Sequence, residues 1–287
     1  MRGVLLSLLI PTATTYGLFE KIRERRQQAY VRTFKRDDQK MLNRSLVDAV
    51  EHRKFDEVLR LVTLNRAFGG KLDVNGQYLR PNDSLLHIAV RNGDLISVVG
   101  LVSSNYDQGR KKDLCNINAC DALGRTPYML AIENHQQEIA DFLEREHRDL
   151  FYVTLSGTAL HVALNARDEE RVQRILSKID HQPFFLDSNR EKLRQFFNKT
   201  DFKGKTSFHL GLEAFLNDEL SAAALSELLY WVDEFFDYHA PTAKSLLTLA
   251  RQAHQKIIKK KLFFFQKDDS PRERQLCQHL EKIITQH

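Results

Sequence analysis

The sequence has few of the residues that mark special chain architecture or redox chemistry. Its 287 residues include 3 cysteines, 6 prolines, 12 glycines and 1 tryptophan. So few prolines and glycines argue against long disordered linkers. The odd, sparse cysteines, Cys115, Cys120 and Cys277, provide no disulfide framework and predict a reducing compartment, the cytoplasm. Leu, Ala, Glu, Lys, Arg and Gln are abundant instead, and these residues favour helices.

The sequence also lacks a long hydrophobic run. The apolar stretch at residues 4–10 ends at Pro11 and is far shorter than the ~20 residues that span a bilayer. Residues 1–15 fit either of two interpretations. They form a minimal export signal without an Ala-x-Ala cleavage site, or an apolar segment that packs on the fold or stays loose. We expect the rest of the chain to be soluble.

The charge is divided along the chain. Residues 1–44 and residues 241–287 each hold 10 Lys/Arg and 4 Asp/Glu, so the segment between them has a net charge of −7 within a total of +5. A uniformly basic nucleic-acid-binding protein would not show this division, so we expect no nucleic-acid partner. The basic ends keep one alternative open, which is an adaptor for a membrane surface or a nucleic acid.

Five segments repeat one short pattern, in which Leu or an aromatic residue is followed three positions later by Ala or Gly. They are Leu46-Val47-Asp48-Ala49, Leu86-His87-Ile88-Ala89, Tyr128-Met129-Leu130-Ala131, Leu160-His161-Val162-Ala163 and Phe208-His209-Leu210-Gly211. Such recurrence predicts stacked units rather than a catalytic pocket. We expect each small residue to lie where the first helix of one unit packs against the first helix of the next, because a larger side chain would overpack that seam.

A turn signal precedes the third unit. Gly124 can adopt a positive φ at a hairpin tip, Thr126 is a natural N-cap, and Pro127 suits the first helical position. With Asp121 and Ala131, these residues form a pattern that resembles the ankyrin repeat. The segments Leu86-His87-Ile88-Ala89 with Gly93-Asp94, and Thr158-Ala159-Leu160-His161-Val162-Ala163, match the same pattern. The resemblance covers about residues 44–236. It implies an all-α solenoid, in which each repeat is a short β-turn finger followed by two antiparallel helices.

The repeats are irregular. The small residues are 40, 42, 32 and 48 positions apart, and only the spacing of 32 is close to the ankyrin period of about 33. The excess predicts insertions at about residues 63–82, 103–120 and 180–200, which either serve binding or are neutral loop growth. The last insertion contains Phe196-Phe197, so we expect it to pack as a helix.

Three parts follow from this pattern. We predict a basic N-terminal segment with a capping helix over residues 1–43, and five ankyrin-like repeats over residues 44–236. A degenerate sixth repeat then forms a basic helical cap over residues 237–287, since end units need a polar outer face. We expect this array to be a monomer.

Two apparent catalytic motifs are better explained by the repeats. Gly204-Lys205-Thr206 resembles the end of a phosphate-binding loop, but position 199 is Lys where that loop needs Gly. We assign it to the finger of the fifth unit. His147-Arg148-Asp149-Leu150 resembles a kinase catalytic loop, but position 154 is Thr where that loop needs Asn. We predict no catalytic residue and no cofactor.

Three histidines, His87, His161 and His209, share one repeat position. Stacked units would hold them about 10 Å apart, which is too far to share one metal ion. We therefore predict no metal site. We expect each ring nitrogen instead to form a hydrogen bond with the backbone near the adjacent finger.

The sequence predicts a non-enzymatic scaffold that binds a protein partner of unknown identity. In ankyrin-like arrays the binding surface is the concave face, formed by the finger tips and the exposed side of each first helix. We expect packing to leave polar residues free at these positions: Arg91, Asn92, Arg125, Glu133, Asn134, Asn165, Lys203, Lys205 and Glu213. The alternative is an effector that a bacterium exports into a host cell, where its repeats grip a host protein.

A basic cluster near the C-terminus is a second candidate surface. Lys256, Lys259, Lys260 and Lys261 precede Phe263-Phe264-Phe265. Such a cluster contacts anionic lipid or nucleic acid, or it is a capping helix with solvated lysines and buried phenylalanines. We favour the capping helix.

Overall fold

The structure is a computed structural model that describes residues 36–67, 82–103, 106–107, 110–111, 115–146, 152–180, 187–237, 239–264 and 271–285. The apolar run at residues 4–10 and the kinase-like motif at residues 147–150 lie outside these ranges. So do most of the predicted N-terminal cap and of the first insertion.

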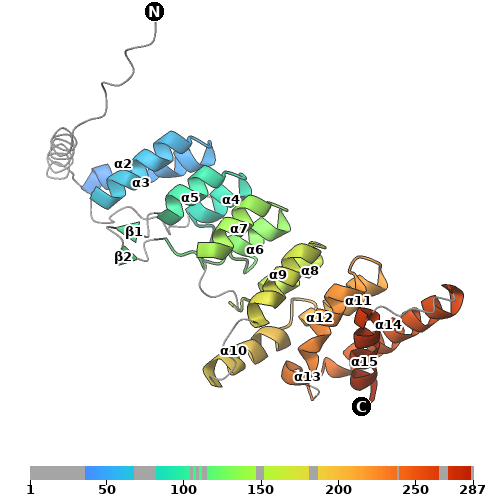
Figure 1. Cartoon of the computed structure of the whole chain (residues 1–287). Helices are drawn as coiled ribbons and strands as arrows, with labels where there is room; N and C mark the ends of the chain where they lie inside the picture. Colours follow the sequence, from blue (N-terminus) through green and yellow to red (C-terminus); the bar gives the residue numbers. More distant parts are fainter. Residues whose placement is uncertain are drawn as a thin grey trace, which may run out of the picture.

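Helices stack in antiparallel pairs along the chain (Figure 1). The first helices of the pairs are α2 (Arg36–Glu51), α4 (Leu85–Arg91), α6 (Pro127–Glu133), α8 (Ala159–Asn165), α11 (Ser207–Leu216) and α14 (Ala243–Phe264). The second helices are α3 (Phe55–Ala67), α5 (Leu95–Ser103), α7 (Gln137–Glu146), α9 (Glu169–Asp180), α12 (Ala222–Tyr230) and α15 (Pro271–Thr285). First helices contact one another in order, and most second helices do the same. The fold is thus the predicted all-α solenoid, with two layers of helices around one continuous core.

Four of the first helices, α4, α6, α8 and α11, begin at a Ser or Thr N-cap. Their N-caps are Ser84, Thr126, Thr158 and Thr206, and each has extended backbone angles. The Thr126 hydroxyl accepts a hydrogen bond from the Met129 amide at 3.2 Å, and Pro127 occupies the first helical position. These contacts satisfy amide groups that have no partner inside a helix, as the turn signal predicted.

In three of these helices a histidine ring accepts a hydrogen bond from the amide of the N-cap residue. The same ring also contacts the next unit. The Thr158 amide donates to Nδ1 of His161 at 3.3 Å, and Nε2 of the same ring lies 3.3 Å from the Lys205 carbonyl oxygen in the next finger. His87 and His209 make the equivalent contacts, to the carbonyl oxygens of Arg125 and Thr242. The predicted hydrogen bonds from ring nitrogens to the adjacent finger are confirmed.

The small residue of each repeat is fully buried, but one of these residues faces a different neighbour from the one we expected. A Cβ atom added to Gly211 would lie 2.3 Å from Cδ2 of Leu228, a residue of the second helix α12 in the same unit. The expectation that this position faces the first helix of the next unit is therefore wrong for Gly211. Glycine is needed there because the two helices of the pair approach closely.

The insertions stand where one unit connects to the first helix of the next. The second contains a two-residue antiparallel ladder of β1 (Tyr106–Asp107) and β2 (Arg110–Lys111). The third contains α10 (Asp187–Asn198), which buries Phe196 and Phe197 completely. Phe197 stacks on Phe208 at 5.2 Å and, at 5.6 Å, on Phe235 of the short helix α13 (Val232–Phe235). The prediction that residues 180–200 pack as a helix is confirmed for α10.

Candidate protein-binding surface

In three of the repeats, two charged residues face one another along the first helix. The first position directly precedes the N-cap residue, and the second position lies seven residues after the N-cap residue. Arg125 and Glu133 form an ion pair in the third unit, and Lys205 and Glu213 form one at 2.6 Å in the fifth. The fourth unit has Gly157 and Asn165 at these positions, and therefore no charge pair. The sequence signal for this pairing is the shared spacing of eight residues.

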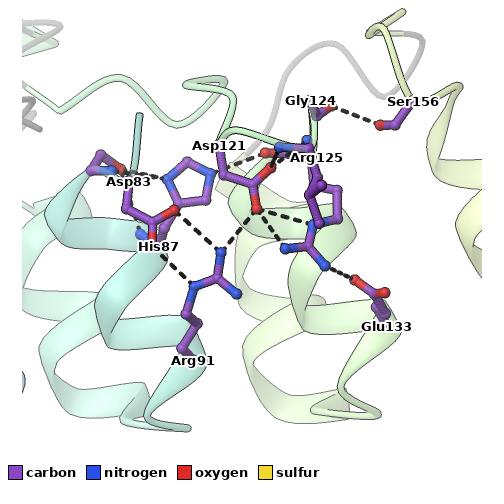
Figure 2. Close-up of polar contacts among 10 residues, drawn as sticks. Asp83, His87, Arg91, Asp121, Gly124, Arg125, Glu133 and Ser156 are labelled. Carbon is purple, nitrogen blue, oxygen red and sulfur yellow. Dashed lines mark hydrogen bonds and ion pairs between the residues drawn. The ribbon is translucent and has the colours of Figure 1, made fainter. Parts of the chain in front are cut away.

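In the second unit the same pair has its charges reversed, and it extends into a chain of five charged groups (Figure 2). Arg91 contacts the Asp83 carboxylate at 3.1 Å and the Asp121 carboxylate of the next unit at 3.0 Å. Arg125 binds Asp121 from the other side at 2.7 Å and continues to Glu133. The alternating charges join the second and third units across their seam.

Asp121 is the centre of this chain. Its side chain is almost completely buried, and its Oδ1 also accepts hydrogen bonds from the backbone amides of Leu123 and Arg125. Burial alone would raise the pKa of Asp121, but the hydrogen bonds and charge of Arg125 outweigh it and hold that pKa below its ordinary value. The carboxylate therefore stays ionised and holds the finger in shape.

These contacts correct the expectation that packing leaves the predicted polar residues free. Arg91, Arg125, Lys205 and Glu213 are engaged in ion pairs within the array. Asn92 donates to the carbonyl oxygens of Val50 and Glu51 at the end of α2, at 2.9 and 3.2 Å. Three of the predicted residues have exposed side chains and no such engagement among the contacts described here: Asn134, Asn165 and Lys203. Glu133 is also exposed, although it binds Arg125.

Sequence reasoning missed the apolar residues at the finger tips. Leu123, Leu155 and Phe202 occupy the tips of three successive fingers, and they are 55%, 78% and 73% exposed. Tyr152 and Val153 add further exposed apolar surface at the base of the fourth finger. The sequence did contain a signal for these residues. Each is a large apolar residue inside a turn of mostly polar residues and Gly, where a side chain is not expected to be buried.

The third and fourth tips lie side by side. The Ser156 hydroxyl donates to the Gly124 carbonyl oxygen at 2.8 Å (Figure 2). A Cβ atom at Gly124, where φ is +73°, would lie 3.3 Å from Cβ of Leu155. The fifth finger is tied to the fourth unit through His161 and Lys205. The tips are therefore displayed on a supported row rather than on independent loops. We call Leu123, Leu155 and Phe202 the tip row.

The basic cluster has a structural use that the sequence did not show. Nζ of Lys256 donates to the carbonyl oxygens of Phe215 and Leu216 at 2.8 and 2.9 Å, and it contacts the Asp218 carboxylate at 2.6 Å. Lys256 thus caps the C-terminus of α11 and is not free for an anionic surface. Lys259 is exposed on α14, and the side chains of Lys260 and Lys261 lie outside the described part of the chain.

Several other features of the described residues bear on metal, membrane and nucleophile chemistry. Among them, no group of three or more His, Cys, Asp or Glu side chains could hold a metal ion. No helix in the described ranges is both long enough and apolar enough to span a membrane. Gly204-Lys205-Thr206 forms the fifth finger and the cap of α11, as predicted. Burial raises the pKa of the Cys115 thiol to about 12, so this cysteine is not a nucleophile at neutral pH.

Comparison with known proteins agrees with this architecture. The family model for ankyrin repeats (3 copies) matches residues 86–187, which extend from the first turn of α4 past the end of α9. No curated protein matches the chain. Ankyrin repeats are general protein–protein interaction modules. The resemblance inferred from the sequence is confirmed for residues 86–187, where the chain contains ankyrin repeats.

Proposed function

We propose that the chain is a non-enzymatic scaffold that binds one segment of a partner protein along the tip row and the adjacent exposed side of the first helices. The observation that carries this proposal is the row itself, in which three neighbouring fingers each expose a large apolar side chain. Exposed apolar residues that gather on a supported surface, rather than singly, are typical of interaction sites.

The fourth unit is the centre of the proposed surface. It lacks the charge pair of its neighbours, and it contributes Tyr152, Val153 and Leu155. The charged residues of the third and fifth units are already paired with each other within the array. A partner that placed an unpaired charge against them would bury that charge without a counter-charge, which is unfavourable. This arrangement suits a partner segment with apolar anchors over the tip row and polar groups facing Asn134, Asn165 and Lys203.

The test is affinity capture with the intact chain, followed by binding measurements with the captured partner. The double variant Leu155→Ser/Phe202→Ser should weaken binding by 10-fold or more, because central aromatic and apolar anchors dominate interface energies. Its unfolding midpoint should be unchanged, since both side chains are exposed. The matched control is Ile96→Ser, which removes an exposed apolar side chain from α5, away from the fingers.

Unchanged binding by the double variant would place the interface elsewhere. An equal loss in Ile96→Ser would show that any loss of exposed apolar surface weakens binding, which would contradict a role specific to the tip row.

A further inference from the structure

A pocket of ≈ 380 Å³ lies among the second helices of the last three units, on the opposite layer from the first helices. Its walls come from α9, α12 and α15, so it exists only when three units stack. Leu176 and Trp231 are buried at its base, and Tyr230 stands at its rim with 58% of its surface exposed. Nothing in the proposed function of the fingers uses this pocket.

Three aromatic rings surround the space. The ring of Tyr230 is perpendicular to that of Trp231, with centroids 5.0 Å apart, and perpendicular to that of His279 at 6.3 Å. Trp231 is held from behind, because Phe197 stacks on it at 6.2 Å and Phe235 packs on it at 5.8 Å. The indole is therefore fixed by the aromatic core, while the Tyr230 ring stands free enough to contact a ligand.

The charge of the pocket has one sign. Glu227 lies one helical turn before Tyr230, is exposed, and lines the same space. Among the described residues that line the pocket there is no Lys or Arg. The faces of aromatic rings attract cations, and a carboxylate at the rim adds to that attraction. An anion would meet Glu227, and a purely apolar ligand would leave that carboxylate partly desolvated.

We infer that this pocket binds an alkylammonium cation, with the charged carbon–nitrogen group over the exposed ring of Tyr230 and with Glu227 as its counter-ion. Such a group is weakly hydrated and is attracted to the face of an aromatic ring. It belongs either to a free small molecule or to a methylated lysine side chain of a polypeptide. Both present the same chemistry to the pocket.

The chain provides its own probe, since Trp231 is its single tryptophan. Indole fluorescence and the indole N–H resonance of the intact protein should both respond to choline in a saturable way. The neutral isostere 3,3-dimethylbutan-1-ol has the same shape without the charge, and it should bind at least 5-fold more weakly. N-acetyl-trimethyllysine methylamide forms the second arm. Tighter binding of this derivative than of choline would assign the cation to a protein side chain, and the reverse order would assign it to a small molecule.

Two variants separate charge from shape. Glu227→Gln should weaken choline binding about 5-fold, and Tyr230→Leu should remove the saturable response. The control Glu138→Gln removes an exposed carboxylate from the second helix α7 outside the pocket, and it should bind choline as the unaltered protein does. Equal binding of choline and its isostere would overturn the proposal, as would the absence of a saturable response. The Leu155→Ser/Phe202→Ser variant should bind choline as the unaltered protein does. A failure of the proposal for the tip row can therefore be distinguished from a failure of the proposal for the pocket.

Discussion

At the residue scale, the buried histidines each satisfy two backbone groups with one ring. In the fourth unit, Nδ1 of His161 accepts from the Thr158 amide, and Nε2 faces the Lys205 carbonyl oxygen as a donor. Only the neutral ring with its proton on Nε2 can do both. Burial lowers the pKa of His161 to about 4, and it lowers the pKa values of His87 and His209 in the same direction. Repeat stacking thus depends on an uncharged side chain.

Replacing His161 with Ala should lower the free energy of unfolding by about 3 kcal/mol, because it removes the cap contact, the contact with the next finger and a buried ring. Urea denaturation measures this loss. The control His239→Ala alters an exposed histidine and should change stability little. A bound metal lost together with His161 would contradict the structural role.

Replacing Gly211 with Ala should also destabilise the fold. Alanine favours a helix interior by about 1 kcal/mol over glycine, but the added methyl would meet Leu228 at 2.3 Å. Overpacking of this kind costs about 1–3 kcal/mol, so we expect a net loss. Thermal unfolding of Gly211→Ala tests the sign. A higher unfolding midpoint would show that α11 and α12 can move apart without cost.

At the element scale, single side chains connect helices that are far apart in the sequence. Lys256 of α14 donates hydrogen bonds to the last carbonyl groups of α11, and its positive charge there also compensates the helix dipole. Arg171 of α9 is almost completely buried and reaches α7, where it contacts Gln137 and Asp141 at 2.7 Å and also binds Glu144. Such polar contacts connect helices of successive units in addition to the hydrophobic core.

The variant Lys256→Met should lose about 1–2 kcal/mol of unfolding free energy, since it leaves two carbonyl groups and Asp218 without their cation. Lys259→Met removes a neighbouring exposed lysine from the same helix and is the matched control. Chemical denaturation compares the two. Equal effects would mean that general charge, rather than the cap on α11, is responsible.

The variant Arg171→Met should lose about 2 kcal/mol or more, because it removes the polar contacts of Arg171 and leaves the buried carboxylate of Glu144 with Lys178 as its cation. The double variant Arg171→Met/Glu144→Leu should be more stable than Arg171→Met, since it also removes the buried carboxylate that has lost one of its two cations. Denaturation of both proteins measures the difference. A double variant less stable than the single one would refute this account of the seam.

The positions of helices were easier to predict from the sequence than the long-range contacts of single side chains. Thr126 and Pro127 mark the start of α6 in the sequence, because helix caps depend on nearby residues. The ring contacts of His87, His161 and His209 followed from their shared repeat position. The partners of Lys256 and Arg171 did not follow, because each lies 27 or more residues away. The tip row was missed because we assumed that polar residues form the binding surface, and the pocket was missed because three units build it.

At the scale of the whole molecule, the histidines make stability depend on pH. The folded state keeps them neutral, whereas an unfolded chain binds protons near pH 6.5. Stability should therefore be complete above that pH and fall as the pH drops from about 6.5 towards 4. His161 alone should account for about 2 kcal/mol between pH 7.5 and pH 5. Asp121, whose pKa is lowered, adds a loss only in more acidic solution.

Denaturation of the intact chain at a series of pH values checks this dependence. The variant His161→Gln does not titrate, so its stability should fall less steeply over the same range. An identical slope in the variant would assign the pH dependence to other groups.

The chain of alternating charges also bears on how the array avoids misassembly. Units that look alike can stack in the wrong order, for instance if the second unit skipped the third and docked on the fourth. Arg91 would then face Thr154, which occupies the place of Asp121 in the shorter fourth finger, and it would lose one of its two carboxylate partners and keep only Asp83. The Asp121 carboxylate thus favours the native order of the repeats over an order in which one repeat is skipped.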